Sequence, residues 1–246
     1  MRGFVDLHCH YLPSIDDGVR SEDDGVALLR ALGEVGFAHV VATPHIRPGM
    51  FDNRAEPLRE VYARMRARLD GETGLPETSL AAEHYFDEVV FGLLMRGEGL
   101  PYGTGRTALL EFHQDSLPLQ LAARLFDLRR RRLRPVIAHP ERYAPFWSDP
   151  AKQAEAMRRA GGVLLLDVMS LEGRYGERAQ RTAERLLDDD AYYAACSDAH
   201  RPADAEVVGK AIARLEALVG VDAARTLLTE RPRSVIDGKI FDEAYD

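Results

Sequence analysis

Short apolar runs alternate along the chain with longer, charge-rich stretches of helical spacing. The apolar runs, predicted as strands, lie at residues 3–8, 37–43, 78–83, 107–112, 134–139, 162–167 and 192–197. The helical patterns lie at 22–36, 53–69, 117–131, 150–160, 176–189, 203–218 and 221–229. A repeated strand–helix unit predicts a parallel α/β fold, either a barrel or a doubly wound sheet. Because no linker or internal repeat interrupts it, one domain over residues 1–246 is the simplest interpretation.

Most of the predicted strands end at ionisable side chains. These are His8 and His10 after the first strand, His45 after the second, Glu83 at the third, Glu111 at the fourth, His139 at the fifth, and Asp198 and His200 after the seventh. Asp16 and Asp17 follow the first strand in a loop. A parallel barrel gathers the carboxyl ends of its strands on one face, where active sites lie. We therefore expect these side chains to meet at one site.

The segment VDLHCH (residues 5–10) places two imidazoles one residue apart. Alternation along a strand points His8 and His10 to one face and Cys9 to the other. A lone His-x-His pair can also be two surface histidines, so the other strand ends carry the argument. Five imidazoles and four carboxylates exceed the three or four protein ligands of a single zinc ion. Nine ligands, one of them bridging, would hold three ions, and this mixture suits manganese, iron or zinc.

Charge and composition narrow the class of protein. The formal net charge of −8 disfavours nucleic acid as the main partner. No apolar run approaches the roughly 18 residues of a membrane span, and no signal-peptide pattern precedes the first strand. Two cysteines, Cys9 and Cys196, allow at most one disulfide. We expect a cytoplasmic protein that does not insert into membranes; its oligomeric state cannot be predicted.

The ordered motifs of the chain resemble the PHP (polymerase and histidinol phosphatase) superfamily. They are DLHCH (6–10), DDG (16–18), TPH (43–45), AE (82–83), EF (111–112), AHPERY (138–143) and SDAH (197–200). Within the superfamily, GMF (49–51) and HPERY make the chain most similar to bacterial protein-tyrosine phosphatases of capsule and exopolysaccharide loci. The resemblance covers residue 3 to about 201. It implies a distorted TIM-like (β/α)7 barrel of the PHP type, holding three divalent metal ions, with manganese favoured over iron or zinc.

The resemblance also implies how the ligands divide among the ions. One ion would take His8, His10, Glu83 and Asp198; a second would share Glu83 and add Glu111 and His139; a third would take Asp17, His45 and His200. Reasoning from the residues leaves Asp16 and Asp17 both open, and the resemblance favours Asp17.

Three arginines are candidates for phosphate binding, since a guanidinium makes bidentate contacts to phosphate. Arg142 of HPERY matches the phosphate-contacting arginine of the family. Arg47 is a second candidate. The family has a further arginine some residues after its last Asp-x-His, whereas here Arg201 follows His200 directly and is the candidate substitute.

Several neighbouring residues have simpler interpretations. Tyr11, Phe51 and Tyr143 lie beside the motifs and are candidates to flank an aromatic substrate ring. His39 is predicted to pack inside its strand, and His84 and His113 to support ligands or lie at the surface. The basic run at 129–134 is predicted to be a solvated helix end rather than a polyanion site. Asp167, at the end of the sixth strand, is left without a role.

Together these features predict a metal-dependent phosphatase. Neither cysteine is followed by an arginine six positions later, which disfavours a cysteinyl-phosphate mechanism. The resemblance implies phosphotyrosine as substrate, on a bacterial tyrosine kinase that controls polysaccharide export. One alternative is another PHP phosphoesterase, such as a histidinol phosphatase or an exonuclease. A second is a non-catalytic module that binds a kinase, for which lost ligands would be expected.

Overall fold

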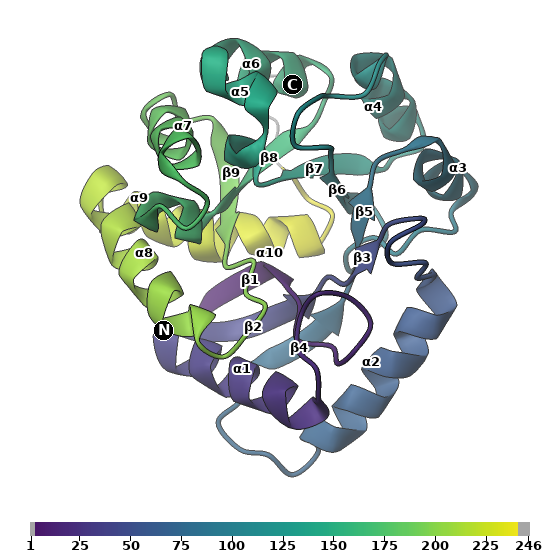
Figure 1. The fold of residues 1–246 in the computed structure, drawn as a ribbon, viewed down its shortest axis with the longest axis vertical. Coiled ribbons are helices and arrows are strands. Elements are labelled where there is room, and N and C mark those ends of the chain that lie inside the picture. The colour runs from purple at the N-terminus through teal and green to yellow at the C-terminus, as the bar shows by residue number, and fades with distance from the viewer. Residues whose placement is uncertain (1–2, 241–246) are drawn as a thin grey trace.

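The computed structural model describes residues 3–240, and its strands follow the predicted alternation (Figure 1). The strands are β1 (Phe4–Cys9), β2 (Phe37–Ala42), β3 (His45–Ile46), β4 (Glu77–Leu80), β5 (Glu83–Tyr85), β6 (Thr107–Glu111), β7 (Arg134–Ala138), β8 (Val163–Asp167) and β9 (Tyr192–Cys196). All of their pairings are parallel, in the orders β1-β2-β4 and β3-β5-β6-β7-β8-β9. Neighbours thus follow chain order, unlike the strand order of a doubly wound sheet.

The predicted third strand at 78–83 is interrupted, and β4 and β5 lie on either side of the break. The N–H of Ala82 donates to the carbonyl of Leu100 (2.9 Å) instead of to a neighbouring strand. The second strand is interrupted in the same region, between β2 and β3, where Pro44 has no N–H to donate. Hydrogen bonds still cross both breaks, since Ala81 N–H donates to Ala42 O (2.8 Å).

The first and last strands also lie side by side. The N–H of Asp198 donates to the carbonyl of His8, and the N–H of His10 donates to the carbonyl of Ala199, both at 2.9 Å. These two bonds place the loop after β9 against the end of β1. Residues almost two hundred positions apart in the sequence are therefore neighbours at the carboxyl ends of the strands.

The helices surround the strands (Figure 1). They are α1 (Glu22–Val35), α2 (Ala55–Leu69), α3 (Glu88–Arg96), α4 (Leu121–Arg130), α5 (Ala144–Ser148), α6 (Pro150–Arg159), α7 (Glu177–Asp188), α8 (Asp204–Val219), α9 (Val221–Arg225) and α10 (Arg231–Ile236). Short turns of tighter or wider helix lie at Pro140–Arg142, Val168–Glu172 and Thr226–Glu230. In residues 3–240 no helix is both long and apolar enough to cross a membrane.

Each predicted helix is present, although the last is divided: the stretch 221–229 is α9 followed by a wider helical turn. Helices α3, α5 and α10 were not predicted. Helix α3 begins at a cap, since the Asp87 carboxylate accepts the N–H of Val90 (2.8 Å), and it ends before Gly97 at φ 76°. Its apolar sequence EVVFGLLMR was too short for a clear helical period.

Two apolar clusters lie on opposite sides of the strands. The outer cluster joins the strands to the surrounding helices and includes Cys9. The inner cluster contains Leu7, Val41, Leu109, Val136, Leu165, Ala194 and, from α10, Val235. Helix α10 lies near the start of β6, because the hydroxyl of Thr107 donates to the carbonyl of Val235 (2.7 Å). The amino-terminal half of the interior is thus filled with apolar side chains, and the carboxyl ends are left to the polar cluster.

Candidate metal centre

Glu83, the first residue of β5, lies at the middle of a buried polar cluster. Its Oε2 lies 3.1 Å from His8 Nε2 and 3.0 Å from His45 Nδ1, and its Oε1 lies 3.0 Å from His139 Nε2. His10 Nε2 lies 3.6 Å from the same Oε2. Four imidazoles from three strands, β1, β3 and β7, therefore surround one carboxylate that is 1% exposed.

Two further carboxylates complete the buried part of the cluster. Asp198 Oδ1 lies 3.2 Å from His8 Nε2 and 3.4 Å from His10 Nε2. Glu111, the last residue of β6, lies 3.6 Å from His45 Nδ1. These contacts connect the ends of β1, β3, β5, β6 and the loop after β9.

The structure brings all nine predicted ligands together. They form four overlapping groups: His10, Asp17, His45 and His200; His8, His10 and Asp198; His8, Glu83 and His139; and His45, Glu83 and Glu111. The groups resemble the three implied ligand sets, but they are not identical to them. His10 also joins the group around Asp17, and His45 also joins the group of Glu83 and Glu111.

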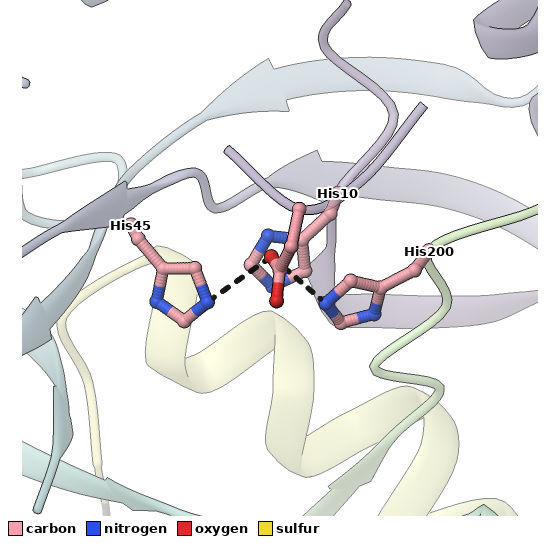
Figure 2. Close-up of side chains that lie close together, drawn as sticks. His10, His45 and His200 are labelled. Atoms are coloured by element: carbon pink, nitrogen blue, oxygen red, sulfur yellow. Dashed lines mark ion pairs between the residues drawn. The ribbon is translucent and has the colours of Figure 1, made fainter. Parts of the chain in front are cut away.

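The two adjacent aspartates have different positions. Asp17 Oδ1 lies 3.4 Å from both His45 Nε2 and His200 Nε2, and Figure 2 shows the His10, His45 and His200 rings around this point. Asp16 instead accepts from His10 Nδ1 (2.8 Å) and from the backbone N–H of Gly18 (3.0 Å). Asp17 thus belongs to the cluster, while Asp16 orients the His10 ring through Nδ1, the nitrogen that faces away from the cluster.

Backbone conformation turns two of the candidate ligands inward. His139 and Asp198 have left-handed φ values of 34° and 49°, which are uncommon for residues other than glycine. Ala138 already faces the inner cluster, so a continued strand would point His139 outward. The left-handed turn reverses this direction. Such strain persists where the surroundings enforce it, typically at functional sites.

The chemistry of the cluster fits divalent metal ions. His45 Nδ1, Glu111 Oε2 and Asp198 Oδ1 face the cluster and are buried without a hydrogen-bond partner in the described part of the protein. Unpartnered buried polar atoms are costly, and a bound cation would satisfy such a set. Imidazole nitrogens mixed with carboxylate oxygens are ligands that manganese, iron and zinc accept.

The pKa values of the cluster show how strongly its charges interact. Burial opposes the charged form of Glu83, yet His8 and His45 hold the pKa of Glu83 well below its ordinary value. Burial and the Glu83 charge raise the pKa of Glu111 to about 7. Burial and the Arg142 charge lower the pKa of His139 to about 4, which favours the neutral, metal-binding imidazole.

Two of the three predicted arginines lie against the cluster. Arg142 Nη1 contacts Asp198 Oδ2 at 2.5 Å and Asp167 Oδ2 at 3.5 Å. Arg47 stacks over the ring of Tyr85 (4.1 Å), and its charge acts on Glu111 to lower the pKa of that carboxyl. Arg142 and Arg47 thus bring positive charge to a site that is otherwise rich in carboxylates.

Arg201, the third predicted arginine, lies at the exposed edge of the site. Arg201 is exposed. Its backbone N–H donates to Asp204 Oδ2 (3.0 Å), and the same oxygen accepts the backbone N–H of His200. Asp204, the first residue of α8, therefore fixes the loop that carries His200. Sequence reasoning missed this carboxylate, although its place four residues after a candidate ligand was a visible signal.

The prediction that three aromatic residues flank the substrate is wrong for two of them. Tyr11 is 0% and Tyr143 is 1% exposed, and neither ring can meet a ligand that enters from solvent. Tyr143 instead supports the site, since its hydroxyl accepts the N–H of Phe112 (3.1 Å) and its ring packs on His139. Phe51 is partly exposed and stacks on His45, with ring centroids 5.3 Å apart.

The remaining histidines lie outside the cluster. His84 is buried and joins backbone groups: it contacts the carbonyl of Leu109 through Nδ1 and accepts the N–H of Leu100 at Nε2. His113 is exposed at the surface. His39 is half-buried and pairs with Ser79 (2.8 Å), in keeping with a packing role.

Another support that was missed is Asp6. Its carboxylate accepts the backbone N–H of Ser197 (2.9 Å) and of His8 (3.2 Å). It thus ties the start of one candidate ligand segment to the segment that carries Asp198. Its position inside an apolar strand, as the only acid of VDLH, was the signal.

The fold and the cluster define the class of protein: a TIM-like α/β protein with a candidate polynuclear metal centre at the carboxyl ends of its parallel strands. The chain belongs to the family described as capsular polysaccharide synthesis, CpsB/CapC, whose sequence profile matches residues 4–237. The resemblance to the capsule-locus phosphatases is therefore confirmed.

Relatives of known name cover most of the chain. The tyrosine-protein phosphatase YwqE of Bacillus subtilis is 29% identical over 198 residues, which is 80% of this chain and 77% of YwqE. The tyrosine-protein phosphatase CpsB of Streptococcus pneumoniae is 25% identical over 240 residues, 94% of this chain and 98% of CpsB.

Solved structures agree with the fold. A crystal structure from a study of YwqE and CpsB, described as unique metal-dependent tyrosine phosphatases, matches with a TM-score of 0.87 at 27% identity, covering 96% of both chains. The phosphotriesterase homology protein of Escherichia coli matches with a TM-score of 0.60 at 14% identity, covering 96% of this chain and 99% of that one. The second likeness is one of fold alone, and it supports the predicted TIM-like α/β class.

Proposed function

We propose that this chain is a metal-dependent protein-tyrosine phosphatase. The observation that carries the proposal is the cluster around Glu83, in which nine candidate ligands meet with Arg142 bound to one of them. The family and the activity named for YwqE and CpsB support the same assignment. The alternative of a non-catalytic module is less well supported, because it predicts lost ligands and none of the nine is missing.

Three divalent ions, manganese first, would be held by these nine side chains. His8, His10, Glu83 and Asp198 would hold one; Glu83, Glu111 and His139 a second; and Asp17, His45 and His200 a third. When bound, such ions bind phosphate oxygens, activate water and stabilise the charge of the transition state. Three dications would outweigh the four ligand carboxylates by two charges, which favours a phosphate dianion despite the acidic protein.

The side chains of the protein itself orient the substrate. Arg142 offers a planar guanidinium, whose paired N–H groups match two phosphate oxygens. Arg47 approaches from the neighbouring strand end, and Arg201 is the third proposed phosphate ligand, at the exposed edge beside His200. Asp16 holds the His10 ring through Nδ1, which leaves Nε2 directed into the cluster.

The turn that carries Arg142 is held in place by buried hydrogen bonds. This turn, Pro140–Arg142, is tied to the next two strands through the fully buried Glu141. The Glu141 carboxylate accepts the backbone N–H of Asp167 (3.1 Å) and the hydroxyl of Tyr192 (2.8 Å). A rigid turn of this kind presents the guanidinium at a fixed place, as substrate positioning requires.

The proposed substrate is phosphotyrosine in a protein, on a bacterial tyrosine kinase that controls polysaccharide synthesis and export. We place this reaction in the cytoplasm, and the two free, buried cysteines, Cys9 and Cys196, are compatible with a reducing compartment.

The test compares three substrates: a phosphotyrosine peptide, histidinol phosphate and single-stranded DNA. Protein stripped of metal and refilled with manganese is expected to hydrolyse the peptide best, and His139→Ala is expected to remove the activity. Turnover of histidinol phosphate or DNA alone would replace the phosphotyrosine assignment by another phosphoesterase. A metal-loaded protein that hydrolyses none of them would contradict the enzyme assignment.

A further inference from the structure

A short segment between β8 and α7 lies against Arg142 and has no assigned role. It runs from Gly173 to Gly176, and both glycines have left-handed φ values, 72° and 91°. Between them, Tyr175 places its ring under the Arg142 guanidinium, 4.3 Å from ring centroid to Cζ. Asp167, the last residue of β8, lies against the same guanidinium, with its Oδ2 3.5 Å from Arg142 Nη1.

Arg142 therefore meets three groups in the protein. Asp198 and Asp167 contact its Nη1, and Tyr175 covers one face of its plane. Its Nε is buried without a hydrogen-bond partner in the described part of the chain. A guanidinium held at one nitrogen and on one face keeps its other N–H groups for a ligand.

The three contacts are not equivalent. Asp198 is also a proposed metal ligand, so its charge would be shared with the ions. Asp167 and Tyr175 have no proposed ligand role, although the Asp167 carboxylate also accepts the backbone N–H of Met169 (2.9 Å). Stacking on an aromatic face restricts the tilt of the guanidinium plane, and this tilt decides whether two parallel bonds to phosphate can form.

We propose that Tyr175 is a positioning residue for Arg142: its ring sets the plane of the guanidinium, which Asp198 and Asp167 hold at Nη1. The proposal rests on the proposed function, in which Arg142 binds the phosphate of the substrate. Tyr175 itself touches neither the substrate nor the ions.

The neighbouring residue joins the same segment to a second part of the site. Arg174 Nη2 lies 3.3 Å from Asp204 Oδ1, and the other oxygen of Asp204 accepts the N–H groups of His200 and Arg201. Both side chains of the Arg174–Tyr175 pair thus contact groups that hold the site. These two contacts hold the segment against Arg142 and Asp204.

The test uses two substitutions at this position in the metal-loaded full chain. Tyr175→Leu removes the aromatic face and the hydroxyl, whereas Tyr175→Phe keeps the face. We measure the binding of inorganic phosphate by calorimetry, and KM and kcat with a phosphotyrosine peptide. Tyr175→Leu should weaken phosphate binding about tenfold, whereas Tyr175→Phe, which keeps the aromatic face, should change it by less than about twofold. KM should rise more than kcat falls, because the contact between Arg142 and phosphate stabilises the bound substrate as well as the transition state.

A double-mutant cycle separates positioning from simple structural support. In an Arg142→Ala background, Tyr175→Leu should have no further effect on phosphate binding, since the residue through which it acts is gone. The matched control is Tyr62→Phe, which removes a hydroxyl bonded to Thr78 away from the site and should leave phosphate binding unchanged. Metal content and the emission of Trp147, which donates to the carbonyl of Glu141, report whether the local fold is intact.

Each outcome has a clear meaning. Unchanged phosphate binding in both Tyr175 variants, or a loss that adds fully to that of Arg142→Ala, would overturn the role of Tyr175 and leave the proposed function standing. A wild-type protein that binds no phosphate and hydrolyses no peptide would overturn the proposed function, and the role of Tyr175 with it. If Tyr175→Leu unfolds, Tyr175→Met, which also lacks the aromatic face, and its cycle with Arg142→Ala decide the matter.

Discussion

The two ends of the same parallel strands differ sharply in chemistry. At the amino-terminal end the interior holds Leu109, Val136 and Leu165, covered by Val235 of α10. At the carboxyl end, two or three residues further along the same strands, it holds Glu111, His139 and their partners, and several of these polar atoms have no hydrogen-bond partner among residues 3–240. One scaffold therefore combines an apolar half with a half that is costly to bury.

This contrast indicates which end stabilises the fold and which end performs the chemistry. Burial of apolar side chains stabilises at the first end, at about 25 cal/mol per Å² removed from water. Burial of charged groups opposes folding at the second end unless they are paired or bind metal. Substitutions at the two ends should accordingly change different measurable quantities.

The largest expected effect is at the carboxyl end. Glu83→Ala removes the carboxylate that four imidazoles surround, and activity should fall by at least about a thousandfold. Metal content, measured by mass spectrometry, should fall with it. Retained activity with full metal content would show that Glu83 is not the centre of the site.

At the amino-terminal end, Leu165→Ala should have the opposite profile. It leaves a cavity in the inner cluster and should lower the free energy of unfolding by about 2–5 kcal/mol. Denaturant unfolding measures the loss, and metal content per folded chain should not change. A loss of metal without a loss of stability would break the distinction between the two ends.

The pH dependence of stability should distinguish the metal-free cluster from the loaded one. Burial lowers the pKa of His10, but Asp16 outweighs it and raises the pKa of His10 from 6.5 to about 9. This raised pKa stabilises the metal-free protein below pH 6.5, and the contribution is lost as the pH rises through about 9. Metal binding needs the neutral imidazole, so the stabilisation by manganese should grow over the same range.

Melting temperatures with and without manganese, at about pH 6.5 and about pH 9, measure both trends. Asp16→Asn is the matched variant, because it removes the charge that raises the pKa of His10. In the metal-free protein, this substitution should reduce the fall in melting temperature between the two pH values. An unchanged fall would assign the pH dependence to other groups.

The smallest expected effect is at the exposed edge. Arg201→Ala should raise KM for a phosphotyrosine peptide by about threefold or less, since an exposed cation contributes little. Arg142→Ala, by contrast, should raise KM by more than about tenfold. If the two arginines prove equal, the guanidinium of Arg201 has a more central position in the substrate complex than in this structure.

The sequence predicted the strands and the nine cluster residues because both depend on short patterns. Apolar runs mark the strands, and the carboxyl ends of parallel strands must meet. It could not predict that the strand at 78–83 is interrupted, because the break depends on a hydrogen bond from Ala82 to Leu100 far along the chain. Nor could it predict α10, whose Arg-Pro-Arg sequence has no helical period, and whose place is set by the open end of the inner cluster.

The supporting side chains were harder to predict than the candidate ligands. Asp16 and Asp17 are the same residue type at adjacent positions, and only the direction of each carboxylate in the structure shows which one faces the cluster. Tyr143 and Tyr11 lie beside motifs in sequence but are buried in space. Tyr175 lies outside every motif, and its contact with Arg142 is visible only in three dimensions.

The most direct test of the central claim is a titration of the metal-stripped protein with manganese, with hydrolysis of a phosphotyrosine peptide as the readout. The account predicts no turnover in the stripped protein and a rise that saturates near three equivalents of bound manganese per chain. Full turnover by the stripped protein, unchanged by added manganese, would contradict it.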